Sequence, residues 1–375
     1  MTQLTQSMAT DTAGNRNSKH WQSSRLLILA DTWLQRLRVR KQSASEHSHW
    51  WDFVFRWRRE KMSYCQDFIA GVYRFSPMQR FAFAGETITI WDYPDRLIIS
   101  LLLSLIKPVF KHIISPQCLH LQGPCGVKTA TQQLQKALKS KPFRYVIRAD
   151  IRGYYASIDH EILIQQVQES FDDPRVRGYF QAMITAPIDA GGVLLSPNKG
   201  IPRRSGLSPF LGALYLTPLD RAFEQKKGVY YVRYMDDIII LAQTKRQYVK
   251  AKRRLYYVLN GLKLQLSPHK TRMGMLADGF HFLGVKFESS QNDLNQIQVT
   301  AEIHDRSCRR ALERVRVMKE DAVNSANIQR YLRRWATWWA RTIGLYVPAD
   351  LLVAWQSYIH AYEPQWVWLA RGLLI

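Results

Sequence analysis

The sequence has 375 residues and carries 53 Lys and Arg against 30 Asp and Glu, a formal net charge of +23. Its hydrophobic content of 46% is enough for a large core and argues against a chain that is disordered throughout, while the charge predicts a polyanionic partner. The longest apolar run, residues 97–106, is too short for a membrane span of about 20 residues, and the polar start does not resemble a signal peptide. We therefore expect nucleic acid rather than a membrane as partner, and a cytoplasmic location.

The N-terminal part of the chain is rich in aromatic and basic residues. We expect disorder to about residue 18, an amphipathic helix over 21–40 and a second helix over 51–74. Residues 87–91 predict a strand, and Pro94 and Asp95 begin an apolar helix that we expect to reach residue 114. Interleaved aromatic and basic side chains suit nucleic-acid binding, but a helix with one core face and one solvated face explains them equally well.

The central part alternates strands and helices. Residues 143–158 predict a buried strand leading into a turn, after which Asp159 caps a helix. A hairpin is expected between Gly191 and Asn198, and a helix over 209–224. We expect the region 50–345 to form one continuous, multi-part enzyme.

The C-terminal part begins with the stretch "YVRYMDDIIIL", which predicts two strands, 230–234 and 238–241, around a turn. A strongly basic amphipathic helix follows from about residue 244, and residues 279–287 predict a strand or tight hairpin. After residue 291 the pattern is mainly helical. Four cysteines are too few for a disulfide scaffold, and their spacing does not predict a zinc site.

Asp236 and Asp237 raise the main chemical question, because charged residues are rarely buried among apolar strands unless they are paired or bind a metal. Two adjacent carboxylates repel each other unless a cation neutralises them, and Mg²⁺ prefers such oxygen ligands together with substrate phosphates. Asp150, at the end of another predicted strand, is the candidate third carboxylate. The pattern indicates magnesium and phosphate chemistry, although a hairpin with two solvated aspartates is the simpler explanation of the dipeptide alone.

Five motifs in order resemble those of reverse transcriptases. They are "IRADIRGYYASIDH" (147–160), "GIPRRSGLSPFLGALYLTPLD" (200–220), "YVRYMDDIIIL" (231–241), "LSPHKT" (266–271) and "GFHFLGVKF" (279–287). The resemblance implies an α+β right-hand polymerase with an antiparallel palm sheet and a helical thumb. The parts it implies are an N-terminal extension (1–50, partly disordered, then helical), fingers (51–142), a palm with finger-like inserts and a primer-grip hairpin (143–290), and a thumb or C-terminal region (291–375).

The resemblance also implies roles for individual residues. Asp150 and Asp236 would hold two Mg²⁺ ions, for which Mn²⁺ can substitute, with Asp237 in weaker contact and the Ile151 carbonyl as a further ligand. Lys270 would donate a proton to pyrophosphate, unless it is an ordinary surface lysine. The catalytic set implied is thus Asp150, Asp236, Asp237 and Lys270.

For substrates, the resemblance implies that Tyr155 excludes a 2′-hydroxyl and so selects dNTPs, unless it is a core aromatic. The primer end would be positioned by the hairpin residues Gly279, Phe280, Phe282, Leu283 and Gly284. The sequence departs from the family where Arg203 and Arg204 replace the usual glutamine and glycine. We hypothesise that they bias the template or nucleotide used; simple charge neutralisation is the alternative. Triphosphate contact would fall to Arg74, Arg80, Arg96 or Lys128, and we list Arg96 with Tyr155, Arg203 and Arg204 as nucleotide-binding.

The function implied is RNA-directed DNA polymerisation, with RNA as template or as a structured non-coding partner, DNA as product and dNTPs as substrates. The chain most resembles compact bacterial enzymes of the stand-alone "unknown group" linked to antiphage defence. Group II intron-like and retron enzymes are the alternative within the family. A non-catalytic RNA-binding or splicing-assist protein and an RNA-directed RNA polymerase are alternatives of other classes. A homo-oligomer or a partner reverse transcriptase stays open.

Overall fold

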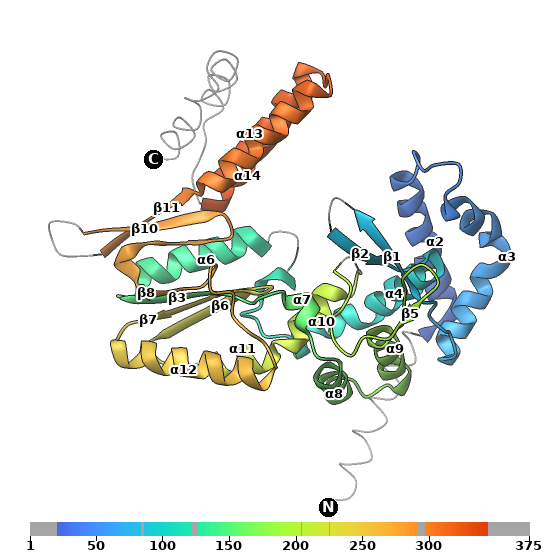
Figure 1. The fold of residues 1–375 in the computed structure, drawn as a ribbon, viewed down its shortest axis with the longest axis horizontal. Helices are drawn as coiled ribbons and strands as arrows, with labels where there is room; N and C mark the ends of the chain where they lie inside the picture. Colours follow the sequence, from blue (N-terminus) through green and yellow to red (C-terminus); the bar gives the residue numbers. More distant parts are fainter. Residues whose placement is uncertain are drawn as a thin grey trace, which may run out of the picture. The chain divides into compact units, whose positions relative to one another are not determined.

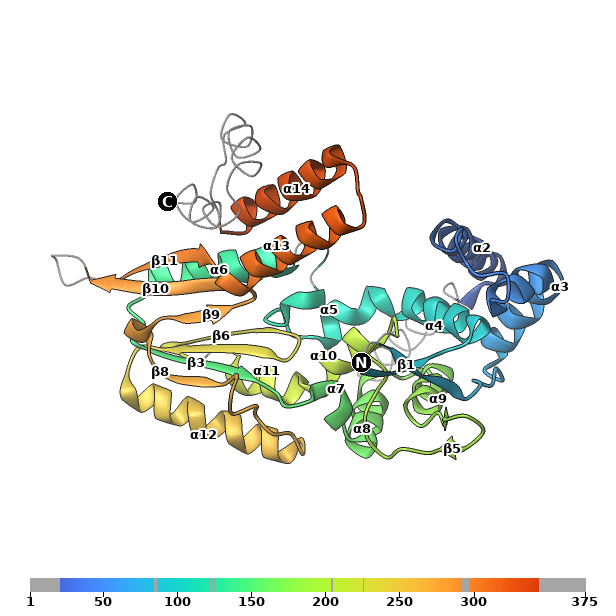
Figure 2. The same ribbon diagram turned by 45° about the horizontal axis from the view of Figure 1, so that its top comes forward.

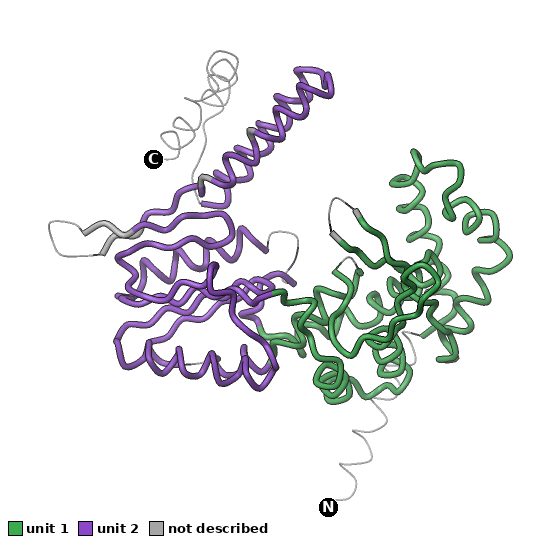
Figure 3. Tube along the Cα trace, in the orientation of Figure 1, with its two compact units in different colours: residues 1–115, 153–217 green, residues 116–152, 218–375 purple. Residues whose placement is uncertain are grey.

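The computed structural model describes residues 21–83, 86–121, 123, 126–203, 205–224, 226–291 and 297–343. The Cα trace divides into two compact units, and both are built from segments that are not contiguous in sequence (Figure 3). Residues 1–115 and 153–217 form unit 1, and residues 116–152 and 218–375 form unit 2. The expected disorder at the N-terminus lies outside the described residues. The four-part division into extension, fingers, palm and thumb stays a prediction.

Unit 1 is mainly helical and has one small sheet. Its helices are α2 (Ser23–Arg40), α3 (His49–Ala70), α4 (Tyr93–Ile106), η2 (Lys107–Val109), α5 (Phe110–Ile113), α7 (Tyr154–Ser157), α8 (His160–Ser170), α9 (Pro174–Ile184) and α10 (Ser208–Tyr215). Its strands are β1 (Met78–Phe83), β2 (Glu86–Ile90), β4 (Ile188–Asp189) and β5 (Leu194–Leu195), in the order β2-β1-β4-β5. The predicted helices over 21–40 and 51–74, the strand near residue 87 and the hairpin at Gly191–Gly192 are confirmed.

Two predicted helices are shorter than expected, because prolines interrupt them. The apolar helix expected to reach residue 114 ends at Ile106, and Pro108 follows in a 3-10 turn. The helix expected over 209–224 is split between α10 and α11 (Thr217–Phe223), with Pro218 at the start of the second. Proline lacks the N–H that continues the helical hydrogen-bond ladder. Asp159 does cap α8, since its side chain accepts a hydrogen bond from the Ile162 N–H at 3.2 Å.

Unit 2 is a layered structure of sheets and helices (Figures 1 and 2). Its strands are β3 (Tyr145–Asp150), β6 (Val229–Tyr234), β7 (Asp237–Ala242), β8 (Arg272–Met275), β9 (Phe280–Phe282), β10 (Val285–Gln291) and β11 (Ile297–Ile303). Its helices are η3 (Leu119–Leu121), α6 (Gly126–Ser140), α11 apart from its first residue, α12 (Lys245–Gly261), η4 (Leu276–Asp278), α13 (Asp305–Glu320) and α14 (Ser325–Ile343).

The central sheet of unit 2 has the order β6-β7-β3-β8, and all its neighbouring strands are antiparallel. Helix α6 covers one face of this sheet and α12 covers the other (Figures 1 and 2). On the α6 face, Leu134 packs in one buried cluster with Val146, Ile239 and Leu241, and the cluster extends to the second sheet, β11-β10-β9. A mixed fold of helices and sheets is thus confirmed, with antiparallel sheets in unit 2 and one parallel strand pair, β1 with β4, in unit 1.

Strand β11 was not predicted, because the region after residue 291 was expected to be mainly helical. Its sequence "IQVTAEI" alternates apolar and polar residues, the pattern of a half-buried strand. The helices expected after it are present as α13 and α14. Among the described residues, no helix is both long enough and apolar enough to span a membrane.

Candidate active site at the β6–β7 hairpin

The two adjacent aspartates lie at the tip of the hairpin formed by β6 and β7. The last cross-strand pair is Tyr234 with Asp237, so Met235 and Asp236 form a two-residue loop. Met235 has a φ of 55°, a left-handed conformation that such tight loops require but that costs a non-glycine residue roughly 1–2 kcal/mol. The flanking strands are buried, whereas Asp236 and Asp237 are only partly buried. The buried strands therefore anchor a partly accessible tip, and the two aspartates do not lie inside the core.

Asp150 and Asp237 are direct partners on neighbouring strands. Strand β3 pairs with β7 in antiparallel register, and Asp150 lies opposite Asp237 at the end of the ladder. Side chains directly opposite each other in such a pair project from the same face of the sheet. The structure thus places Asp150 next to Asp237, on the face that α6 also covers.

Burial and the neighbouring carboxylates together perturb the pKa of Asp237. Burial is the main cause that raises the pKa of Asp237 to about 6, and the Asp236 and Asp150 carboxylates add to it. The Arg148 guanidinium opposes this effect and forms an ion pair with Asp237 at 3.2 Å. The three carboxylates and their negative charge therefore suit a divalent cation that prefers oxygen ligands.

Lys270 contacts the first aspartate directly. Its Nζ lies 3.3 Å from Oδ2 of Asp150, and its backbone carbonyl accepts a hydrogen bond from Arg148. The Asp150 carbonyl accepts from the Ser267 N–H at 2.8 Å, which fixes the loop carrying Lys270 against β3. Ile151 follows Asp150 and bridges to Leu266 of the same loop. Asp150, Ile151, Asp237 and Lys270 are thus brought together.

The described residues contain no group of three or more His, Cys, Asp or Glu placed to hold a metal ion. Mg²⁺ is often bound by only one or two carboxylates, with substrate phosphates and water as the other ligands. The Asp150–Asp237 pair beside Asp236 fits that mode of binding.

A buried network behind the tip was missed by sequence reasoning. The Arg233 guanidinium donates to the Asp220 carboxylate and, at 3.0 Å, to the Met235 carbonyl. His120 Nδ1 accepts a hydrogen bond from the Met235 N–H at 3.1 Å. Tyr231 donates to Asp220 at 2.6 Å. Both polar groups of the Met235 peptide backbone are therefore held by side chains.

The sequence did carry part of this signal. Arg148 precedes Asp150 by two residues on β3, so strand alternation places both on one face. Arg233 lies within an otherwise apolar strand, where a charged residue requires a partner. The identity of that partner, Asp220 on α11, could not be read from the strand.

The predicted nucleotide-binding residues belong to unit 1. Tyr155 is half-buried, and its ring centroid lies 5.4 Å from that of Tyr154. Both rings pack closely against Gly212, where an added Cβ would lie within 3.3 Å of them. Arg96 donates to the Trp91 carbonyl at 2.8 Å and lies over the Tyr93 ring. Arg203 is exposed, and Arg204 lies outside the described residues. Their predicted roles stay predictions.

The residues 279–287 form the tight hairpin that was predicted, with β9 and β10 paired. Leu283 and Gly284 form its loop, both with positive φ. Gly279 is required because a Cβ would lie 2.9 Å from the Phe287 carbonyl oxygen. Phe280 and Phe282 are buried, and their side chains anchor the hairpin in the hydrophobic core of unit 2. The hairpin's role in positioning a primer stays a prediction.

Clustered carboxylates that can hold divalent cations are a feature of enzymes that transfer phosphoryl or nucleotidyl groups. Comparison with known protein families gives a match over residues 87–287 to the family described as reverse transcriptase (RNA-dependent DNA polymerase). The match covers more than half of the 375 residues and includes all the residues of the tip. The chain belongs to the reverse transcriptase family.

A curated relative is Protein YkfC of Escherichia coli strain K12. It is 24% identical over 222 residues, which cover 49% of this chain and 57% of that protein. The alignment thus spans little more than half the length of the relative. The family match supports the predicted family, and neither comparison distinguishes a subgroup within it.

Proposed function

We propose that this chain is an RNA-directed DNA polymerase that adds deoxynucleotides from dNTPs to a primer 3′-hydroxyl. The observation that carries the proposal is the cross-strand pairing of Asp150 with Asp237 at a tip that also bears Asp236, within the region that matches the reverse transcriptase family. Residues 143–290 would form the palm, 51–142 the fingers and 291–375 the thumb or C-terminal region, following the N-terminal extension.

Asp150, Asp236 and the Ile151 carbonyl would hold two Mg²⁺ ions, with Asp237 in weaker contact. Bound Mg²⁺ would neutralise the triphosphate and make the primer hydroxyl more acidic. Arg148 supports the arrangement by holding Asp237 and the Lys270 loop. Lys270, whose side chain is 62% exposed, can leave Asp150 and donate a proton to departing pyrophosphate.

Tyr155 would exclude a ribose 2′-hydroxyl, and Arg96, Arg203 and Arg204 would contact the nucleotide or the template. The hairpin 279–287 would position the primer end. For biological role, the resemblance of the motifs to defence-associated bacterial enzymes supports an enzyme that acts with a structured RNA in bacterial antiphage defence. A group II intron-like or retron enzyme is the alternative within the family.

Purified protein, with whatever RNA copurifies, tests the proposal. Labelled dNTPs and Mg²⁺ are added with and without a template–primer, and the products are sequenced. We expect DNA synthesis that EDTA stops and that the Asp236→Ala variant lacks. Synthesis that persists in Asp236→Ala would overturn the assigned site. If the wild-type protein made no DNA but bound RNA tightly, the non-catalytic RNA-binding alternative would be favoured.

A further inference from the structure

Helix α12 lies on the face of the central sheet opposite to α6 (Figures 1 and 2). Asp150 and Asp237 share the face that packs with α6. Tyr145, at an odd step from Asp150 along β3, instead stacks on Tyr248 of α12 with ring centroids 5.2 Å apart. Because successive strand residues alternate between faces, α12 and the carboxylates lie on opposite sides of the sheet.

The outer side of α12 is strongly basic. The helix begins with a capping box of Thr244 and Gln247, and it contains six Lys and Arg but no acidic residue. Its buried residues are Ala251, Leu255 and Leu259. Helical spacing places Arg246, Lys250, Arg253 and Tyr257 along the opposite side, and all four are exposed. This row is about 16 Å long at 1.5 Å rise per residue.

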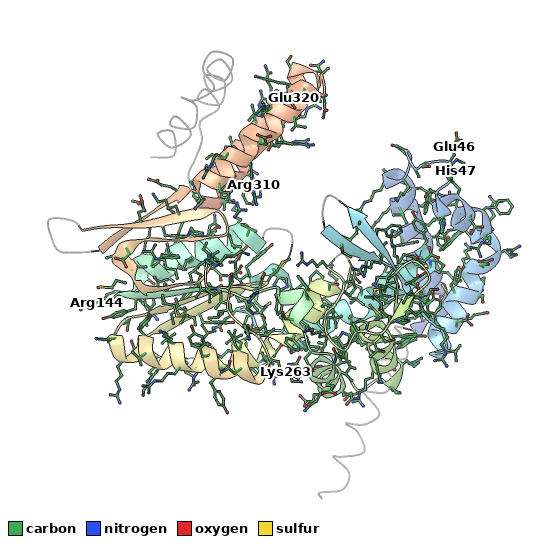
Figure 4. All side chains as sticks on the ribbon, viewed as in Figure 1. Glu46, His47, Arg144, Lys263, Arg310 and Glu320 are labelled. Atoms are coloured by element: carbon green, nitrogen blue, oxygen red, sulfur yellow. The ribbon has the colours of Figure 1, made fainter. Side chains whose placement is uncertain are left out.

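The charges of this row are all of one sign, unlike those of an ordinary solvated helix face. An ordinary solvated face mixes both signs of charge, which pair at helical spacing. Here only positive charge is present, and the large Tyr257 ring, 81% exposed, lies within the row. Figure 4 shows side chains of α12 projecting away from the sheet, with Lys263 just beyond the helix end. Such a row attracts the closely spaced phosphates of a nucleic acid.

A pocket opens beside the C-terminal part of α12. Its volume is about 400 Å³, and it is lined by the end of α12 and by the loop that leads past Lys270 to β8: Tyr256, Leu259, Asn260, Leu264, Gln265, Leu266, Pro268, Thr271 and Met273. The lining combines an aromatic ring and apolar side chains with an amide and a hydroxyl. These groups suit a nucleobase, which stacks on aromatic rings and forms hydrogen bonds at its edges.

We propose that Arg246, Lys250, Arg253, Tyr256 and Tyr257, here called the α12 surface, bind a structured RNA. The basic residues contact its phosphates, and an unpaired base from a loop or bulge enters the pocket beside Tyr256. RNA fits better than duplex DNA because folded RNA presents unstacked bases, whereas a duplex hides them. The choice of RNA among polyanions rests on the proposed function. The basic row lies on the face of the sheet opposite the carboxylates, whereas the pocket reaches the loop that carries Lys270, so a base bound there would lie beside the candidate active site.

The test compares two triple variants of the full chain. In the first, Arg246, Lys250 and Arg253 are changed to Gln; in the control, Lys136, Lys139 and Lys141 at the C-terminal end of α6, which are also exposed, are changed to Gln. Both lose three positive charges, and Gln maintains helix propensity. A charge-conserving variant, Arg246→Lys with Arg253→Lys, and thermal melting of each protein check the fold. The probe is a fluorescein-labelled RNA hairpin with a single-stranded loop, followed by anisotropy over a range of salt concentrations.

We expect the α12 triple variant to bind the hairpin on the order of tenfold to a hundredfold more weakly, with a salt slope reduced by roughly 2–3. The control and the charge-conserving variant should stay within about threefold of wild type. Tyr256→Ala should weaken binding of the hairpin more than binding of a blunt RNA duplex.

Three outcomes would overturn the proposal. Equal losses in both triple variants would show only an effect of net charge. Unchanged hairpin binding in the α12 variant would exclude the surface. If the α12 triple variant lost binding to phosphatidylserine vesicles but kept its RNA binding, the α12 surface would be assigned to a membrane instead. Primer extension by the wild type is measured in parallel, so absence of DNA synthesis contradicts the proposed function without deciding the binding comparison.

Discussion

The Arg233 guanidinium and the Asp220 carboxylate form an ion pair in which both side chains are completely buried. The same guanidinium donates to the carbonyl of Met235, the residue with left-handed backbone at the hairpin tip. The pair thus connects α11 to the turn that carries the candidate catalytic aspartates. Because neither charge is hydrated, each is stabilised by the other, and removal of one leaves a buried charge that no opposite charge compensates.

Replacement of one partner of this pair should destabilise unit 2 strongly. We expect Arg233→Met to lower the free energy of unfolding by about 3–5 kcal/mol, measured by urea denaturation. The double variant Arg233→Met with Asp220→Leu should lose less than either single variant, because no unpaired charge remains. Tyr231→Phe, which removes only one hydrogen bond to Asp220, should cost about 1 kcal/mol. A double variant less stable than both singles would contradict this account.

His120 should position the tip through the Met235 N–H. His120→Leu removes the acceptor, and we expect kcat for primer extension to fall on the order of tenfold to a hundredfold with little change in the KM for dNTP. In His120→Asn the amide oxygen occupies a place near Nδ1 and should restore kcat to within about threefold. A parallel rise in KM in both variants, or equal loss of thermal stability and rate, would indicate a structural role only.

Lys270 should compete with a metal ion for Asp150. Without the lysine charge, 3.3 Å from the carboxylate, we expect Lys270→Met to bind Mn²⁺ a few-fold more tightly in an electron paramagnetic resonance titration. The rate of nucleotide addition should nevertheless fall, since the proton donor is lost. Lys270→Arg retains the charge and should bind Mn²⁺ like the wild type. Weaker binding of Mn²⁺ by the Met variant would refute the competition.

Tyr155 should set the preference for dNTPs over rNTPs. Tyr155→Ala is expected to raise the relative kcat/KM for rNTPs on the order of tenfold or more, since a missing ring no longer clashes with the 2′-hydroxyl. Tyr154→Phe serves as the control, because Tyr154 is buried and donates to the Gly212 carbonyl. Unchanged discrimination in Tyr155→Ala would show that the ring is only a packing residue.

Asp95 should make the stability of unit 1 depend on pH. Burial raises the pKa of Asp95 from 3.8 to about 6, although Tyr73 and the Ser76 N–H donate to its Oδ1. The folded state therefore holds the proton more tightly than the unfolded state. The resulting stability is complete below about pH 4 and is lost as the pH rises through about 6.

Asp95→Asn cannot ionise and should be more stable than the wild type at pH 8 by at most about 3 kcal/mol. The advantage should shrink at pH 5. Thermal melting of both proteins at the two pH values measures this difference. An advantage that is the same at both pH values would show that ionisation of Asp95 has no part in it.

Much of the local structure could be predicted from the sequence because its signals are local. The apolar runs "YVIRAD" and "VYYVRY" predicted buried strands, and the period of residues 244–262 predicted a basic amphipathic helix. The positions where predicted helices were too long, at Pro108 and Pro218, also carried a local signal that the apolar pattern outweighed. Strand β11 was overlooked although its alternation is regular.

The candidate site was predicted only in part. Its aspartates follow from their place at strand ends and from the resemblance of the motifs to a known family. The contacts of Arg148, His120 and Asp220 did not follow, because each partner lies on a different element and strand register decides which side chains meet. Arg148 and Asp237 are 89 residues apart in the chain, and no local pattern connects them.

The sequence by itself determined the charge of +23, the strand–turn–strand at residues 229–242 and the identity of the carboxylates available for chemistry. Only the tertiary structure decided that Asp150 stands opposite Asp237, that a buried Arg233–Asp220 pair holds the turn, and that the basic row of α12 lies on the other face of the sheet. The reason is physical: periodicity records which face of an element is apolar, whereas the pairing of strands and helices decides what that face meets.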